Sequence, residues 1–226
     1  RVLFRSHSLW QRVEKPLFTS ITENETTDVC IVGAGIAGLT VAYRLLKEGR
    51  RVVVVDRERL GLGETGLTSA HLANAMDEGF SELEKQHGRD GARLARESHG
   101  AAIDLIERIA RDENIECDFK RVNGYLFLDP ESKLEDLTQE LEAAHRAGFA
   151  DARLIERAPV RFFDSGPCLE FPRQAQFHPL KYIDGLAAAI QRLGAKIYTH
   201  TEVTAIQGGA HAEVTTGQGF KIKCDA

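Results

Sequence analysis

Three glycines, Gly33, Gly35 and Gly38, have the GxGxxG spacing of a pyrophosphate-binding turn. In such a turn the first glycine allows a tight bend and the second lets the backbone approach the phosphates. The third lets a helix pack closely on the preceding strand. The N–H groups at the start of that helix face the phosphate charge, which the helix dipole also attracts. The spacing therefore predicts a site for the ADP half of a dinucleotide.

The segments around these glycines have the order that the motif requires. Residues 29–32 are apolar and β-branched, which predicts a strand buried on both faces of a parallel sheet. A helical pattern follows the glycines and stops at Gly49. A second apolar strand, residues 52–55, ends at Asp56, about twenty residues after the last glycine, as the fingerprint requires. The Asp56 carboxylate would accept hydrogen bonds from an adenosine ribose and repel a 2′-phosphate.

The segment after the second strand, GLGETGLTSAHLAN at 61–74, bears on which dinucleotide is bound. In a nicotinamide dehydrogenase another crossover helix usually follows at this point. Here the hydroxyls of Thr65, Thr68 and Ser69 and accessible N–H groups could lie along an extended cofactor, which favours FAD. An NAD-dependent dehydrogenase and a flexible connector stay open as alternatives. Arg57 is a further candidate contact, although a solvated surface charge is the simpler interpretation.

Several segments, including this loop, resemble the FAD-dependent oxidoreductases of the D-amino-acid oxidase, glycine oxidase and sarcosine oxidase type. The resemblance covers Thr27 to Ala226 and is closest to a bacterial branch whose members often carry a C-terminal Rieske iron–sulfur domain. Leu67 departs from the pattern of this branch, which has a basic residue there. The segments that carry the resemblance are GETG at 63–66, AHL at 70–72, NGYLFL at 123–128 and FPRQAQFHPLKYIDGLA at 171–187.

The resemblance implies a mixed α/β fold, in which a Rossmann-like FAD-binding domain carries an inserted helix-and-strand substrate domain that covers the flavin. It also implies hydride transfer from an amine or amino acid to FAD, with electrons passing onward to a Rieske 2Fe–2S domain where one is present. The glycines would hold the pyrophosphate, Asp56 the ribose, and the loop the ribityl chain, while a later strand would meet the adenine through its backbone. The implied cofactor contacts are Gly33, Gly35, Gly38, Asp56, Arg57, Thr65, Thr68, Ser69, Ala70, His71 and Val203.

Two histidines are candidates for roles near the flavin or substrate. His71 is the weak catalytic candidate, since it could tune the flavin's electrostatics or bond to it covalently. A structural histidine bonded to backbone is the simpler interpretation of His71. His178 precedes Pro179 and could either line the substrate side or cap a helix.

The expected domain organisation follows from the resemblance. Residues 1–26 form a tail, of which 1–6 resemble the translated end of a sequencing adaptor and are set aside as a possible artefact; a real flexible N-terminal tail is the alternative. Residues 27–76 and 177–226 form the FAD-binding domain, and 77–176 form the substrate domain. The chain is expected to be an N-terminal fragment with an exposed sheet edge, so a fragment that binds the ADP moiety without turnover is a third alternative.

The remaining elements are predicted from periodicity and turn signals. Helix 78–114 would bury Leu94, Ile103, Ile106 and Ile109 and break around Gly88 to Gly91. Residues 117–129 would form strands around an Asn-Gly turn. Further helices are expected at 133–148 and 179–193. Further strands, a third sheet strand and a small antiparallel meander, are expected at 195–198, 203–207, 211–216 and 220–223.

Composition excludes several other classes of protein. The net charge of -5 with dispersed Lys and Arg argues against a nucleic-acid partner. No apolar run approaches the length of a membrane helix, so the cytoplasm is the expected location. The four cysteines are scattered and predict neither a metal site nor a disulfide framework. The expected partner is a small amine or amino acid.

Overall fold

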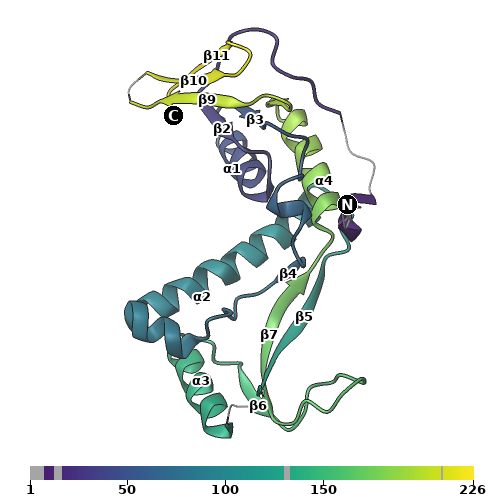
Figure 1. Ribbon diagram of the computed structural model, residues 1–226, viewed down its shortest axis with the longest axis vertical. Helices are drawn as coiled ribbons and strands as arrows, with labels where there is room; N and C mark the ends of the chain where they lie inside the picture. Colours follow the sequence, from purple (N-terminus) through teal and green to yellow (C-terminus); the bar gives the residue numbers. More distant parts are fainter. Residues whose placement is uncertain (1–7, 13–16, 130–132, 210) are drawn as a thin grey trace, which may run out of the picture. The chain divides into compact units, whose positions relative to one another are not determined.

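The computed structural model describes residues 8–12, 17–129, 133–209 and 211–226. They form two α/β units (Figure 1). The residues up to Ser69, Ile109–Cys117 and His178–Ala226 make the first unit, and Ala70–Arg108 and Asp118–Phe177 make the second. The adaptor-like residues 1–6 lie outside the described part of the chain.

The first unit contains the predicted parallel sheet. Strands β2 (Val29–Val32), β3 (Val52–Val55) and β8 (Lys196–Tyr198) are parallel and lie in the order β2-β3-β8. Helix α1 (Ile36–Lys47) connects β2 to β3. This is the arrangement of one half of a doubly wound nucleotide-binding fold, so the predicted Rossmann-like core is confirmed.

The two strands beside the glycine turn differ in burial. All four residues of β3 are buried, because β3 has a strand on each side. No residue of β2 is fully buried, and Val32 is 51% exposed. The prediction that 29–32 is buried on both faces is therefore wrong, because β2 is the edge of the three-stranded sheet.

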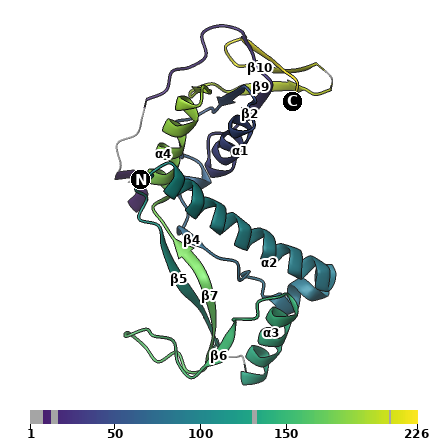
Figure 2. The same cartoon turned by 180° about the vertical axis from the view of Figure 1, so that it is seen from behind.

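A second sheet covers one face of the parallel sheet. Strands β9 (Val203–Gln207), β10 (Ala212–Thr216) and β11 (Lys221–Cys224) form the predicted antiparallel meander, and β1 (Glu25–Thr26) pairs with β11 in parallel. Figures 1 and 2 show this meander on one side of the parallel sheet, with α1 and α4 (Pro179–Arg192) on the other. Alternate residues of β3 thus face opposite layers.

Side chains of β3 join these two sheets into one core. Val53 and Val55 pack in a buried cluster with Val214 and Ile222 of the meander and with Ile21. On the other face, α1 contacts β3 and α4, and α4 contacts β8. The parallel sheet is consequently held between two layers, which fixes the edge where its strands end.

The second unit is built on the long strand β7 (Cys168–Gln176). It pairs antiparallel with β4 (His71–Leu72), β5 (Lys120–Phe127) and β6 (Arg153–Ile155). The prediction of strands around an Asn-Gly turn is wrong, because β5 continues through Asn123 as one strand. Both halves of β5 pair with β7, and the Asn-Gly pair is accommodated by a shift in the strand register.

Helix α2 (Phe80–Asp112) breaks as predicted, at Gly88, which has φ 70° and ψ 173°. Ile103 is buried as predicted, but Leu94 is 56% exposed. Nine residues at roughly 100° each place Leu94 half a turn away from Ile103. Ala92 occupies the buried face instead and is 2% exposed. The prediction for Leu94 is therefore wrong.

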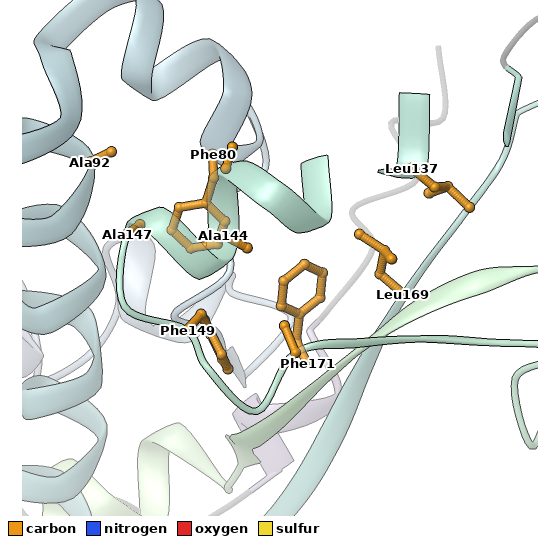
Figure 3. Packing of buried hydrophobic residues seen from close by; sticks show 10 residues of the cluster. Phe80, Ala92, Leu137, Ala144, Ala147, Phe149, Leu169 and Phe171 are labelled. Atoms are coloured by element: carbon orange, nitrogen blue, oxygen red, sulfur yellow. The ribbon is translucent and has the colours of Figure 1, made fainter. Parts of the chain in front are cut away.

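Phenylalanine rings form the core of the second unit. Phe80, Phe149 and Phe171 pack with ring centroids 5.3 to 6.2 Å apart. Figure 3 shows these rings gathered beside the small side chains of Ala144 and Ala147. Ala144 lies in helix α3 (Leu134–Arg146), whose prediction is confirmed. Small residues at this surface let the rings approach the helix backbone closely.

A buried carboxylate joins α3 to the start of α2. Glu140, only 8% exposed, accepts hydrogen bonds from Phe80 N at 2.5 Å and Ser81 N at 2.9 Å. These bonds satisfy two free N–H groups of α2, and the negative charge suits the positive end of the helix dipole.

Glu140→Ala should lower the free energy of unfolding by about 2–3 kcal/mol, because it removes charge-assisted bonds from buried donors. For a chain of this size the expected fall in melting temperature is roughly 4–10 °C, measured by differential scanning calorimetry. Glu142→Ala, at a side chain that is 67% exposed on the same helix, is the matched control and should change stability by less than about 0.5 kcal/mol. Equal effects of the two substitutions would contradict the capping role of Glu140.

The remaining described elements are two short 3₁₀ helices, η1 (Leu9–Arg12) and η2 (Glu64–Gly66). No helix in the described residues is both long enough and apolar enough to cross a bilayer.

Candidate dinucleotide site

The glycine turn between β2 and α1 has a backbone that side chains would disturb. Gly33 has φ 109°, in the left-handed region, and its N–H donates to Val55 O at 2.8 Å. A Cβ on Gly38 would lie 2.0 Å from Gly33 O, and one on Gly35 would lie 3.1 Å from Thr65 Oγ1. Gly38 is therefore the position where α1 touches the turn backbone directly.

The N-terminus of α1 presents free hydrogen-bond donors. Its N-cap, Gly35, supplies no side-chain cap. Within the part of the chain that the structure describes, no acceptor takes the N–H groups of Ala37 and Gly38. Ile36 N donates to Thr65 Oγ1 at 3.2 Å, and a hydroxyl that accepts one bond can still donate another. The turn thus combines free N–H groups, a helix dipole and a hydroxyl, which together suit an anion such as a pyrophosphate.

Asp56 is held at the end of β3 beside this turn. Its Oδ2 accepts from Ala34 N at 2.7 Å, and its Oδ1 accepts from Glu58 N at 2.8 Å. Its own backbone pairs with Tyr198 O and Thr201 N. Each carboxylate oxygen has more than one acceptor position, so both can still accept from ribose hydroxyls. The carboxylate consequently positions the glycine turn and remains able to bind a sugar.

An open hollow of about 500 Å³ lies beyond Asp56 in the same unit. Val203, which follows the lining residue Glu202 in the sequence, begins β9 and pairs with Thr216 of β10. Charged and polar side chains line the hollow, so it offers polar partners to a base or sugar. The residues that line it are Arg57, Glu58, His200, Glu202, Gly217 and Gln218.

The loop that begins at Gly61 is a second packed glycine turn. Gly61 has φ 65°, and a Cβ on it would lie 2.5 Å from Ile183 Cδ1 of α4. A Cβ on Gly66 would lie 2.2 Å from Gly61 O. The contact between Gly38 and Gly33 has the same form and the same five-residue spacing. This packing favours an ordered loop over a flexible connector, and it brings Thr65 to the N-terminus of α1.

The end of this loop carries the other predicted contacts. Thr68 O accepts a hydrogen bond from Trp10 Nε1 at 2.8 Å, while the side chain of Ser69 is exposed. Ala70 is buried and has φ 62°, a strained conformation for a residue with a Cβ. These three positions lie after the turn rather than at the N-terminus of α1.

His71 belongs to the second unit and lies on β4. Its side chain is exposed, and no hydrogen bond from it is found among the described residues. It lines a hollow of about 440 Å³ whose other walls carry aromatic and acidic side chains. Those side chains are Asp77, Glu78, Tyr125, Phe127, Asp129, Asp136, Glu140 and Phe171.

His178 caps α4. Its Nδ1 accepts a hydrogen bond from Lys181 N at 3.2 Å, which confirms the capping alternative. Its ring packs edge to face with that of Trp10, with ring centroids 5.0 Å apart and an interplanar angle of 72°. The indole of Trp10 therefore touches both the start of α4 and the loop after η2.

The NGYLFL segment lies on β5 and holds a buried carboxylate of β7. Asn123 Nδ2 donates to Glu170 Oε1 at 2.6 Å, and Arg153 Nε donates to Glu170 Oε2 at 2.5 Å. These bonds, above all that from Arg153, hold the pKa of Glu170 below its ordinary value. The segment thus stabilises the sheet of the second unit.

The described cysteines are free thiols. Burial raises the pKa of Cys30 to about 12, so this thiol stays protonated and unreactive near neutral pH. Nowhere in the described ranges do three or more His, Cys, Asp or Glu side chains gather in a way that could hold a metal ion.

Two features of the site were not predicted from the sequence. One is the repeated contact of Gly61 with Gly66, for which the five-residue glycine spacing was an available signal. The other is Trp10, which lies in the segment expected to be a tail. The only sign of its importance in the sequence was that it is the single tryptophan of the chain.

A parallel sheet with a glycine turn, donors at a helix N-terminus and a carboxylate at the next strand end defines a dinucleotide-binding protein. The profile of the family described as "FAD dependent oxidoreductase" (DAO) matches residues 28–226. The chain therefore belongs to the FAD-dependent oxidoreductase family that includes the D-amino-acid oxidase and glycine oxidase type. The NAD-dependent alternative is not favoured by this finding.

Curated relatives cover nearly the whole chain. It is 34% identical over 208 residues to a Bacillus subtilis (strain 168) protein named "Putative Rieske 2Fe-2S iron-sulfur protein YhfW". The aligned region covers 92% of this chain and 40% of that protein. It is 30% identical to gamma-glutamylputrescine oxidoreductase of Escherichia coli (strain K12), over 89% of this chain and 48% of that protein. The chain thus spans half or less of the length of these two relatives.

Solved structures share the fold. L-amino acid deaminase from Proteus myxofaciens superposes with a TM-score of 0.74 at 18% identity, over 97% of this chain and 48% of that one. Glycine oxidase from Geobacillus kaustophilus superposes with a TM-score of 0.73 at 20% identity, over 90% of this chain and 54% of that one. The fold of the described residues is therefore that of flavin-type amino-acid oxidoreductases.

Proposed function

We propose that this chain binds the ADP half of FAD at the glycine turn, and that the whole protein oxidises an amine or amino acid. The observation that carries this proposal is the meeting of three features at one helix end. Free N–H groups of α1, the Thr65 hydroxyl and the Asp56 carboxylate all lie around the same turn. Family membership supports FAD as the dinucleotide.

Different residues would bind different parts of FAD. The α1 N-terminus and Thr65 would hold the pyrophosphate, Asp56 the ribose hydroxyls, and the hollow beside Val203 the adenine. Arg57 would contribute from the wall of that hollow. The segment of Thr68, Ser69, Ala70 and His71 would continue along the ribityl chain towards the flavin. Bound FAD would supply the hydride acceptor, which no protein side chain can provide.

The substrate class is proposed from the names of the relatives. Gamma-glutamylputrescine oxidoreductase, L-amino acid deaminase and glycine oxidase all have names that denote amines or amino acids. The likeness to a protein named for a Rieske 2Fe–2S centre supports a further proposal, that the whole protein passes electrons to such a domain. We also retain the expected domain limits, 27–76 with 177–226 for FAD and 77–176 for substrate, and a cytoplasmic location.

The direct test is titration of the purified chain with FAD. Calorimetry and flavin absorbance measure the binding during this titration. Stoichiometric binding, with no binding of NAD under the same conditions, is the expected result. Absence of FAD binding would overturn the proposed site for this chain. Bleaching of the flavin in the whole protein by an amine or amino acid then tests the reaction.

Asp56→Ala should weaken FAD binding at least about tenfold, because it removes both the ribose acceptor and the bond that positions Ala34 N. Asp56→Asn keeps one acceptor oxygen and should weaken binding less. Glu48→Ala, an exposed acid at the other end of α1, is the control and should leave affinity within about twofold. If Asp56→Ala binds FAD as tightly as this control, Asp56 has no role in the site.

A further inference from the structure

Trp10 joins an N-terminal segment to the loop that carries the predicted flavin contacts. Its indole Nε1 donates to Thr68 O at 2.8 Å, across 58 positions in the sequence. Its ring packs edge to face with the ring of His178 at the start of α4. Its side chain is half-buried, and η1 contacts α4. We call the bond to Thr68 and the packing on His178 together the Trp10 contact.

The bond from Trp10 meets the loop between its closed first half and a strained residue. Its first half is closed by its own bonds, from Gly66 N to Gly63 O and from Leu67 N to Glu64 O. After that point the side chain of Leu67 is 61% exposed, and the chain then reaches the strained backbone of Ala70. Thr68 lies between these two features. A hydrogen bond to its carbonyl therefore acts on the part of the loop that the turn itself does not fix.

We propose that Trp10 is a positioning residue that holds the loop of residues 65–69 in the conformation in which it binds FAD. This inference rests on the proposed FAD site. A loop already ordered before binding loses less conformational entropy when the cofactor arrives, so the contact raises affinity without touching the cofactor. By linkage, FAD must stabilise the Trp10 contact by the same factor.

The chain offers a specific probe of this coupling, because Trp10 is its single tryptophan. Intrinsic tryptophan fluorescence therefore reports on the surroundings of Trp10 alone, and acrylamide quenching reports on how accessible its ring is. FAD binding should change this fluorescence saturably, with the same midpoint as the flavin signal. It should also slow acrylamide quenching of Trp10.

The test compares three variants with the wild-type chain. Trp10→Phe keeps an aromatic ring beside His178 but loses the N–H donor, and Trp10→Ala loses both. Leu9→Ala, at a neighbouring side chain that is 65% exposed, is the matched control. Hydrogen exchange of residues 61–69 is measured without FAD, and calorimetry then gives the FAD affinity. Circular dichroism and melting temperature check that each variant is folded.

We expect Trp10→Phe to exchange faster in residues 67–69 and to bind FAD about fivefold more weakly, the loss of one hydrogen bond. Trp10→Ala should show a larger loss, and Leu9→Ala should match the wild type. If the wild-type chain binds FAD but the Trp10 variants show unchanged exchange and affinity, the inference is overturned. If the wild-type chain does not bind FAD while Trp10→Phe still exchanges faster in residues 67–69, the proposed FAD site fails and the loop-holding role stands.

Discussion

Gly38→Ala is expected to weaken FAD binding at least about 100-fold. The new Cβ would lie 2.0 Å from the backbone atom Gly33 O, and no side-chain rotation can move a Cβ away. Helix α1 would have to move off the turn, which would displace the N–H groups of Ala37 and Gly38 from the pyrophosphate. Loss of two hydrogen bonds to a charged group, at about 1.5–3 kcal/mol each, accounts for this magnitude. Calorimetric titration with FAD measures it.

The neighbouring glycine turn supplies the control for this prediction. Gly63 has φ -78° and open space where a Cβ would stand, so Gly63→Ala should leave FAD affinity within about threefold. Gly66→Ala should instead resemble Gly38→Ala, because its Cβ would lie 2.2 Å from Gly61 O and would shift Thr65. Wild-type affinity in Gly38→Ala would show that α1 does not hold the pyrophosphate.

Phe149→Ala is expected to lower the free energy of unfolding of the second unit by about 3–5 kcal/mol. The side chain is completely buried and packs edge-on against Phe171 and Phe80. Its removal leaves a cavity beside α3 that small neighbours such as Ala144 cannot fill (Figure 3). Urea-induced unfolding followed by circular dichroism gives the change in midpoint at constant slope.

Phe162→Ala removes the same ring at a position that is 95% exposed in the same unit. It should change stability by less than about 0.5 kcal/mol. The difference between the two substitutions therefore isolates burial from residue type. Similar midpoints for both variants would mean that the phenylalanine cluster does not stabilise this unit.

The elements around the glycine turn were predictable because their signals are local. A β-branched run, a glycine spacing and a helical period specify β2, α1 and β3 without reference to the rest of the chain. The break of α2 at Gly88 is local for the same reason. Leu94 shows the limit of such reasoning, since the buried face of a helix depends on what packs against it.

Strand pairing is another property that local signals do not specify. The Asn-Gly pair at Asn123 is a common hairpin turn, yet β5 passes through it because β7 offers a continuous partner on one side. The partial exposure of β2 likewise depends on which strands lie beside it. In both cases a long-range neighbour outweighs the local preference.

The sequence by itself determined the chemistry that we propose for the site. Gly33, Gly35, Gly38 and Asp56 could be named because a backbone that must contact a phosphate tolerates few residue types at those positions. Only the tertiary structure decided which distant side chains complete the site. Thr65 reaches the N-terminus of α1 because a second glycine turn packs on α4, and Trp10 reaches Thr68 from a segment that looked like a tail. Contacts between positions far apart in the chain depend on the packing of whole elements, which no single stretch of sequence encodes.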